Sequence, residues 1–215
     1  EQLVVLNRHI LYGVDPETGS VLWDMPLPHF RGMHILTPQI WGDTIFTSPY
    51  RQRSYRVDIR AEDGAFSASE AWTNKATGYM SSPVVLGDHA YMHLGNGRID
   101  CIDLATGESR WRSEQRFGKY WSMVWRDDRI LALDSDGALY LVAANPQRFE
   151  LLDGLQVADE ETWGHLAVSG EDIFVRELEA ISAWRWPTES ASLPAPSQET
   201  HTVLYSKKGS NPTSP

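Results

Sequence analysis

The sequence is poor in several features that would otherwise define its class. It has one cysteine, Cys101, so no disulfide can form within its 215 residues. It contains no run of about 18 apolar residues, which excludes an ordinary membrane-spanning helix. It also lacks a basic excess: 19 lysines and arginines stand against 29 aspartates and glutamates, a formal net charge of −10. Because nucleic-acid-binding surfaces are usually basic, this balance argues against a nucleic-acid partner.

Catalytic motifs are equally scarce. There is no G-x-S-x-G sequence, and Cys101 lies in a predicted strand, where a free cysteine is usually a core residue. Asp134 and Asp136 belong to the sequence DSDG, which is typical of a hairpin turn and lacks the further oxygen ligands of a calcium loop. We therefore predict no catalytic residue.

The histidines form no metal-binding motif. His89 and His93 lie on one predicted strand, where four residues span about 13 Å, too far for both to bind one ion. His29 and His34 lie in one loop and could converge, but the sequence offers no clear third ligand. We predict no metal site.

The sequence does contain a repeat. DPETGSVLW (15–23) returns as DLATGESRW (103–111), and DIRAEDGAFSASEAW (58–72) stands between them. A second series, of turn aspartates, has spacings of 45, 40 and 44 residues at Asp43, Asp88, Asp128 and Asp172. A period of about 40–45 residues made of short strands is typical of β-propeller blades.

The repeat predicts an all-β fold, a β-propeller of four-stranded antiparallel blades with boundaries near residues 33, 78, 120 and 162. The first unit begins at its second strand and the fifth stops after its third. We therefore expect an incomplete arc of about three full and two partial blades over residues 1–188. Residues 189–215 are rich in Pro, Ser and Thr and are predicted to be an irregular or disordered tail, in which HTVLYSK (201–207) could form one strand.

Each of the first three units closes on a tryptophan: Trp23, Trp72 and Trp111. A large apolar ring at the same place in every unit is expected to pack between neighbouring blades. We expect Trp111 to be buried there.

The stretch SPVVLGDHAYMHLGNGRIDCIDLATGESRW (82–111) resembles the pyrroloquinoline-quinone (PQQ) repeat of PQQ-like β-propellers. The resemblance covers roughly residues 3–186 and extends to bacterial PQQ-like propellers of unassigned function and to the lipoprotein scaffold of outer-membrane protein assembly. It implies a complete ring of seven or eight blades and a periplasmic or extracellular location. It also allows PQQ with calcium as a cofactor, although many propellers with this repeat bind no quinone.

The loops that join successive blades, and those that join the second and third strands, form the face that usually carries function in propellers. Here these loops combine cations with aromatic rings, which suits binding of a peptide or polyanion by charge and stacking. The alternative is that the loops are merely polar and their aromatics pack at the channel mouth. The candidate binding residues are Arg31, His34, Arg51, Arg53, Lys75, Tyr79, Lys119, Tyr120, Trp121 and Trp163.

We therefore interpret the chain as a non-catalytic binding or scaffold module whose ligand is a protein or an extracellular polymer. Its other expected partners are the remaining propeller blades, in this chain or another. Two alternatives stay open: a segment of a PQQ-dependent quinoprotein oxidoreductase, and a structural piece without a ligand. The quinoprotein family holds its quinone over a Trp, beside calcium and a catalytic Asp, and these residues cannot be assigned one by one in this sequence.

Overall fold

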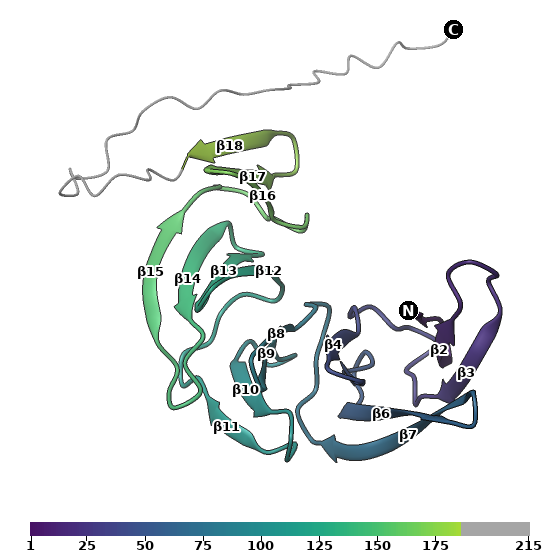
Figure 1. Cartoon of the computed structure of the whole chain (residues 1–215). Coiled ribbons are helices and arrows are strands. Elements are labelled where there is room, and N and C mark those ends of the chain that lie inside the picture. The colour runs from purple at the N-terminus through teal and green to yellow at the C-terminus, as the bar shows by residue number, and fades with distance from the viewer. Residues whose placement is uncertain (186–215) are drawn as a thin grey trace, which may run out of the picture.

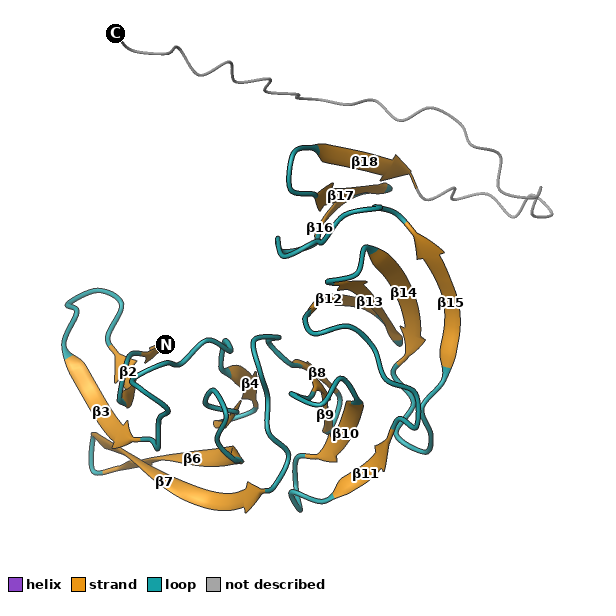
Figure 2. Cartoon of the chain, turned by 180° about the vertical axis from the view of Figure 1, so that it is seen from behind, coloured by secondary structure: helices purple, strands orange, loops and turns teal. Residues whose placement is uncertain are grey.

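The computed structural model describes residues 1–185, which form eighteen strands and no helix. The strands make five antiparallel sheets, each from consecutive strands, and the sheets follow one another round an open arc (Figures 1 and 2). In the three full sheets the first strand lies on the inside of the arc and the last on the outside. This is the arrangement of propeller blades.

Three blades have four strands, and the first and fifth have three. Blade 1 contains β1 (Leu3–Leu6), β2 (Ile10–Val14) and β3 (Val21–Pro26). Blade 2 contains β4 (Gln39–Trp41), β5 (Thr44–Thr47), β6 (Ser54–Glu62) and β7 (Ala65–Asn74). Blade 3 contains β8 (Val84–Leu86), β9 (His89–His93), β10 (Ile99–Asp103) and β11 (Ser109–Arg112). Blade 4 contains β12 (Trp121–Arg126), β13 (Arg129–Asp134), β14 (Ala138–Ala143) and β15 (Leu151–Gln156), and blade 5 contains β16 (Ala167–Ser169), β17 (Asp172–Arg176) and β18 (Ile181–Arg185).

This architecture confirms the predicted all-β propeller with three full and two partial blades. The four predicted boundaries all fall between sheets, in the loops 27–38, 75–83, 113–120 and 157–166. The predicted tail, residues 189–215, and the strand suggested for 201–207 lie outside the described residues.

The repeated nine-residue motif is a turn between the third and fourth strands. In blade 3 the Asp103 carboxylate accepts hydrogen bonds from the backbone N–H of Ala105 and Thr106, both at 3.0 Å, and Gly107 takes a left-handed φ of 78°. Asp15 and Gly19 repeat this arrangement in blade 1. The backbone N–H groups lower the pKa of both carboxyls, because they stabilise the charged form.

Tryptophans connect the blades. The Trp72 indole N–H donates to the carbonyl of Leu104 in blade 3 (2.9 Å), and the Trp111 indole N–H donates to the carbonyl of Asn145 in blade 4 (2.7 Å). Trp111 is only partly buried, although we expected full burial. Because Gly107 packs directly beneath Trp72, where a Cβ would lie 2.6 Å from the ring, Gly107 also makes room for the ring of the preceding blade.

Trp23 is bound differently. Its indole N–H donates to the side-chain oxygen of Gln2 (2.6 Å) within blade 1, and its ring is buried against Ile45 and Val57 of blade 2. The long β6–β7 hairpin extends alongside β3 at this junction (Figure 1). The turn that binds the tryptophan at later junctions has therefore been replaced by a longer hairpin.

The core consists of four clusters, one at each junction between blades. Alternation along each strand sends side chains to both neighbours: Met92 and Ile102 of blade 3 face blade 2, whereas Tyr91 and Cys101 face blade 4. Cys101 is fully buried, and burial raises the pKa of its thiol to about 12. It therefore packs as a core residue.

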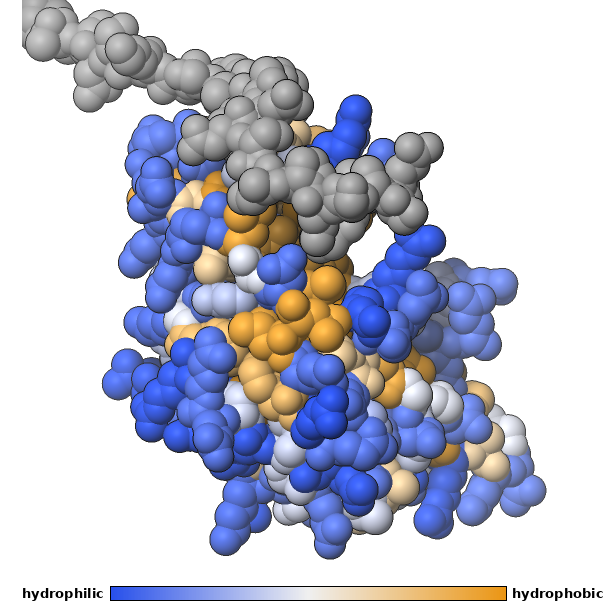
Figure 3. Space-filling view, turned by 90° about the vertical axis from the view of Figure 1, so that its left-hand side faces the viewer, coloured by the Kyte–Doolittle hydropathy of each residue, from blue (hydrophilic) through white to orange (hydrophobic). Residues whose placement is uncertain are grey.

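The junction between blades 4 and 5 is less completely filled. A cleft of about 850 Å³ lies there, lined by apolar side chains that include Val124, Leu131, Leu141 and Val168. Strand β15 carries no tryptophan, so this junction lacks the indole that the outer strand supplies at the junctions before it. Figure 3, seen from the β15 side, shows apolar surface gathered in a hollow on this part of the molecule.

Candidate binding face

The antiparallel order of the strands decides which loops share a face. In the full blades, connections between the second and third strands, and those between blades, leave the sheets at one end, which we call the top face. Blade 1 begins at the equivalent of a second strand, so the corresponding connection there joins β1 and β2. The remaining turns leave at the other end, the bottom face. Hydrogen bonds link the top-face loops directly: Gly95 N–H donates to Thr77 O (3.1 Å) and Ser135 N–H to Tyr120 O (2.8 Å). The top face is therefore a continuous surface across neighbouring blades.

Three aromatic rings lie in a row on this face. The ring centroids of Phe30 and Tyr50 are 6.1 Å apart, and those of Tyr50 and Tyr79 are 5.3 Å apart. These side chains come from the loop before blade 2, from blade 2 itself and from the loop before blade 3. Burial, followed by the neighbouring Tyr79 hydroxyl, raises the pKa of Tyr50.

Cations stack on these rings. The guanidinium carbons of Arg31 and Arg51 each lie 5.2 Å from the centroid of Phe30, and Lys119 Nζ lies 5.8 Å from the centroid of Tyr79. We call the six residues Phe30, Arg31, Tyr50, Arg51, Tyr79 and Lys119 the rim row. Stacking holds the charges in place and leaves their donors available for a ligand.

Both arginines of the rim row have unusual backbone conformations. Arg31 has a φ of 54° and Arg51 a φ of 57°, in the left-handed region that non-glycine residues seldom adopt. The loop around Arg51 is fixed by hydrogen bonds from Gln52 N–H to Pro49 O (2.8 Å) and from Arg51 N–H to Gly78 O (3.4 Å). Such strained positions often mark functional sites, where surrounding contacts hold the conformation.

Sequence reasoning identified Arg31, Arg51, Tyr79 and Lys119, and the structure brings them together. It overlooked Phe30 and Tyr50, which link them. A signal was present, because an aromatic residue directly precedes an arginine in both PHFRG (28–32) and SPYRQ (48–52).

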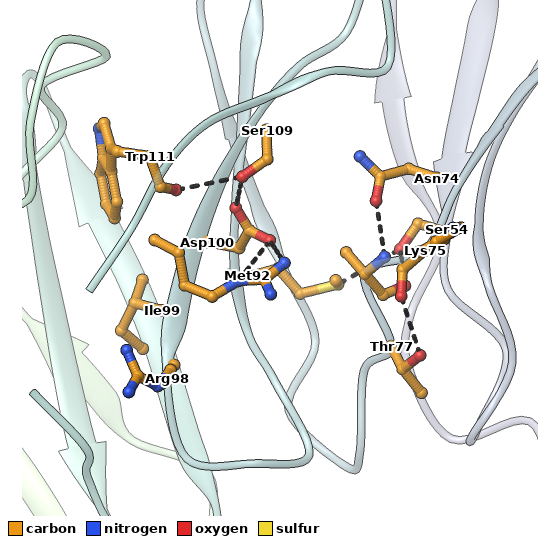
Figure 4. A network of polar contacts seen from close by, with 12 residues as sticks. Ser54, Asn74, Lys75, Thr77, Met92, Arg98, Ile99, Asp100, Ser109 and Trp111 are labelled. Atoms are coloured by element: carbon orange, nitrogen blue, oxygen red, sulfur yellow. Dashed lines mark hydrogen bonds and ion pairs between the residues drawn. The ribbon is translucent and has the colours of Figure 1, made fainter. Parts of the chain in front are cut away.

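Three other predicted residues lie on the top face outside the rim row. Arg53 and Lys75 are exposed. Figure 4 shows the contacts that position the loop of Lys75: Asn74 Oδ1 accepts from Ala76 N–H (2.6 Å), and Thr77 Oγ1 donates to Lys75 O (3.2 Å). His34 lies in the loop 27–38, and both of its ring nitrogens are buried without a hydrogen-bond partner among the described residues. Burial, together with His29 and His9 nearby, lowers the pKa of His34.

Tyr120 and Trp121 were wrongly expected at the rim. Trp121 is the first residue of β12, has 1% of its surface exposed, and donates its indole N–H to Asp134 Oδ2 (2.9 Å). Tyr120 is 5% exposed. Contacts from other loops explain the error: Trp121 N–H donates to Ser81 Oγ (2.8 Å), and the Trp121 ring packs against His93 and Phe117.

Trp163 is exposed but lies apart from the rim row. Its ring stacks on Tyr120 with centroids 5.8 Å apart, and its indole N–H donates to Glu161 Oε2 (2.9 Å). Its surroundings are acidic, unlike those of the rim row.

Basic and acidic residues occupy different parts of the top face. Its loops in the first three blades, including the connection to blade 4, span 7–9, 27–38, 48–53, 75–83, 94–98 and 113–120. They contain a single acidic residue, Glu114, and eight cations, which we call the basic sector: Arg8, Arg31, Arg51, Arg53, Lys75, Arg98, Arg116 and Lys119. The remaining top-face loops, 135–137, 157–166 and 177–180, contain six acidic residues and no lysine or arginine.

The described residues do not fit a calcium-bound quinone. No group of three or more His, Cys, Asp or Glu side chains within residues 1–185 could hold a metal ion. Asp134, one of the two aspartates considered above for a calcium loop, already accepts hydrogen bonds from Gly118 N–H (2.8 Å) and from the Trp121 indole. We derive no chemistry from such a cofactor.

Comparison with known proteins places the chain in a family. The family model PQQ_2, described as outer membrane protein assembly factor BamB, matches residues 1–113, more than half of the 215 residues. The chain belongs to this family. The match spans blades 1 to 3 and six of the eight cations of the basic sector. Arg116, Lys119 and the weaker repeats of blades 4 and 5 lie beyond it. No curated protein matches the sequence.

Solved structures share the fold at low identity. BamB from Moraxella catarrhalis is 13% identical, with a TM-score of 0.53 over 86% of this chain and 70% of that one. The β-propeller domain of Cps50 (Swd1) from Myceliophteria thermophila is 15% identical, with a TM-score of 0.64 over 86% of this chain and 66% of that one. These likenesses establish a β-propeller fold. Within residues 1–185, no helix is long and apolar enough to cross a membrane.

Proposed function

We propose that this chain is a non-catalytic scaffold that binds a protein partner on the top face of blades 1 to 3. The observation that carries this proposal is the rim row, in which aromatic rings from successive loops support stacked, solvent-directed cations. Rigid aromatic residues and arginine are the side chains most often responsible for binding energy at protein interfaces. The left-handed conformations of Arg31 and Arg51 support the same location, and hydrogen bonds fix the loop around Arg51.

Family membership supports the kind of partner. The description of the family names a factor in outer-membrane protein assembly, which is a protein-handling role. We therefore favour a protein over an extracellular polymer, and a periplasmic or outer-membrane-associated location over a cytoplasmic one. The lack of any metal-binding cluster among the described residues offers no support to a quinoprotein reaction.

Site-specific photo-crosslinking tests the proposal. A benzophenone amino acid replaces Tyr79 in the rim row or, as a matched control, the exposed Phe66 of β7. Both variants are expressed in the cell that carries the gene, and crosslinked products are identified by mass spectrometry. We expect a discrete protein adduct from position 79, absent from position 66, that forms again with the purified partner. Equal adducts from both positions, or none from position 79, would contradict a top-face binding site.

A further inference from the structure

The basic sector stands out because the rest of the protein is acidic. The chain has a net charge of −10, yet the basic sector gathers eight cations around one acidic residue. On the bottom face of the same three blades, the turns 15–20, 42–43, 63–64, 87–88 and 104–108 contain six acidic residues and no lysine or arginine. The two faces of these blades therefore have opposite charge.

The cations of the basic sector are not neutralised within the described chain. None of the six ion pairs among residues 1–185 includes any of them; those pairs use other arginines, such as Arg56 and Arg112. Arg98 uses part of its hydrogen-bonding capacity within the protein, because its guanidinium donates to the carbonyl of Ser113 (2.7 Å). Because charge interactions are screened over about 10 Å at 0.1 M salt, a ligand at this surface is governed by the nearby cations more than by the net charge.

These observations favour an acidic polypeptide segment over other polyanions. The basic sector ends where the top face becomes acidic, at the loops 135–137 and 157–166, so a long nucleic acid crossing the face would be repelled. A membrane surface is disfavoured because Tyr50, at the centre of the rim row, is 7% exposed and cannot insert as an apolar anchor. Carboxylates, by contrast, match arginine in geometry and can form paired hydrogen bonds with it.

We infer that the basic sector binds a short, acidic, extended segment of a protein partner, with its carboxylates on Arg31, Arg51 and Lys119. This inference rests on the proposed function, because it names the chemistry of the partner at the same face. The acidic bottom face and the acidic half of the top face direct such a segment away from other surfaces.

The test uses a fluorescent peptide of about 16 residues that alternates glutamate and serine. Binding to the purified 215-residue chain is followed by fluorescence anisotropy, with peptides that replace glutamate by lysine or by glycine as controls. We expect the acidic peptide alone to bind, and raising the salt from about 50 to about 300 mM to weaken it about tenfold.

Paired charge reversals locate the site. The double variant Arg51→Asp/Lys119→Asp should weaken binding of the acidic peptide about tenfold or more. Aspartate tolerates the left-handed φ of position 51 better than most residues do. The matched control, Arg60→Asp/Arg110→Asp, changes two exposed arginines of β6 and β11 that lie outside the top face and should leave binding unchanged. If the first variant is misfolded by circular dichroism, Arg53→Asp/Lys75→Asp replaces it, since both side chains are exposed outside the rim row.

Each result decides the inference. Equal weakening by both pairs of variants, or tighter binding of anionic vesicles or a single-stranded oligonucleotide than of the acidic peptide, would overturn it. If position 79 crosslinks a protein whose contacting segment is not acidic, and the peptide does not bind, the inference fails while the proposed function stands. If neither crosslinking nor peptide binding occurs, both fail.

Discussion

His93 shows how one buried residue links stability to pH. It is fully buried, its ring stacks on Trp121 with centroids 5.6 Å apart, and its Nε2 lies 3.0 Å from the carbonyl of Gly118. Burial lowers the pKa of His93 to about 4, so the folded protein keeps the ring neutral. The unfolded chain binds a proton near pH 6.5, and stability is therefore complete above that pH and falls as pH drops towards 4.

We expect the free energy of unfolding to fall by roughly 2–3 kcal/mol from this residue between pH 6.5 and pH 4. Urea unfolding at a series of pH values measures it, with His93→Gln as the comparison, because carboxylates also titrate in this range. The variant should lose less stability over the interval. Parallel curves for the two proteins would contradict the assigned role of His93.

The loss of stability on replacing a tryptophan by alanine should depend on whether its ring is packed or exposed. Trp121→Ala and Trp111→Ala should each cost about 3–5 kcal/mol, because each removes a large packed ring and an indole hydrogen bond. Trp163→Ala should cost less than about 1 kcal/mol, because that ring is 39% exposed. Chemical denaturation of the three variants measures the difference. If Trp121→Ala proves as mild as Trp163→Ala, the buried position of Trp121 is wrong.

At the scale of elements, two glycines at equivalent turn positions allow two effects of a Gly→Ala substitution to be measured separately. One is the cost of a left-handed backbone conformation, and the other is the cost of disturbing the packing between blades. Gly19 and Gly107 occupy the same turn, with φ of 71° and 78°. A Cβ at Gly19 meets nothing within 4 Å, whereas at Gly107 it would lie 2.6 Å from the Trp72 ring. Gly19→Ala should therefore cost only the left-handed penalty, about 1–2 kcal/mol. Gly107→Ala should cost about 1–3 kcal/mol more.

Thermal or urea unfolding of the two glycine variants gives the comparison directly. Equal losses would show that Trp72 does not pack on the following blade as described.

The strands and their grouping could be predicted because they depend on local chemistry repeated in each unit. Turn aspartates and alternating apolar residues recur every 40–45 residues, and each boundary lay where expected. The rim row could be predicted only in part, because its contacts join residues from different loops, up to 40 positions apart for Tyr79 and Lys119. Phe30 and Arg51 meet through the curvature of the arc, which no local pattern encodes. Trp121 was misplaced because its burial depends on contacts with His93, Phe117 and Asp134, which no local pattern shows.

At the scale of the whole molecule, the arc exposes apolar surface at both of its described ends. Leu3, Val5 and Val21 of blade 1 are 54%, 37% and 58% exposed, and Val168 and Ile181 of blade 5 are 46% and 41% exposed. Unpartnered sheet faces of this kind favour association. We expect the purified chain to self-associate with rising concentration or to bind a hydrophobic dye.

Light scattering over a range of concentrations, together with dye fluorescence, measures this association. Leu3→Lys/Val5→Lys should reduce both signals, and Glu17→Lys on the bottom face serves as control. A compact monomer that binds no dye would show that these faces are covered.

Protection of arginines is the most direct measure of where the partner binds. Arg51 on the top face and Arg60 of β6 belong to the same blade, are both exposed, and form no ion pair among the described residues. Their reaction with an arginine-specific dicarbonyl reagent can be quantified by mass spectrometry, with and without the partner captured through position 79. We expect the partner to protect Arg51 and leave Arg60 unchanged. Protection of Arg60 with Arg51 still reactive would contradict a binding site on the top face.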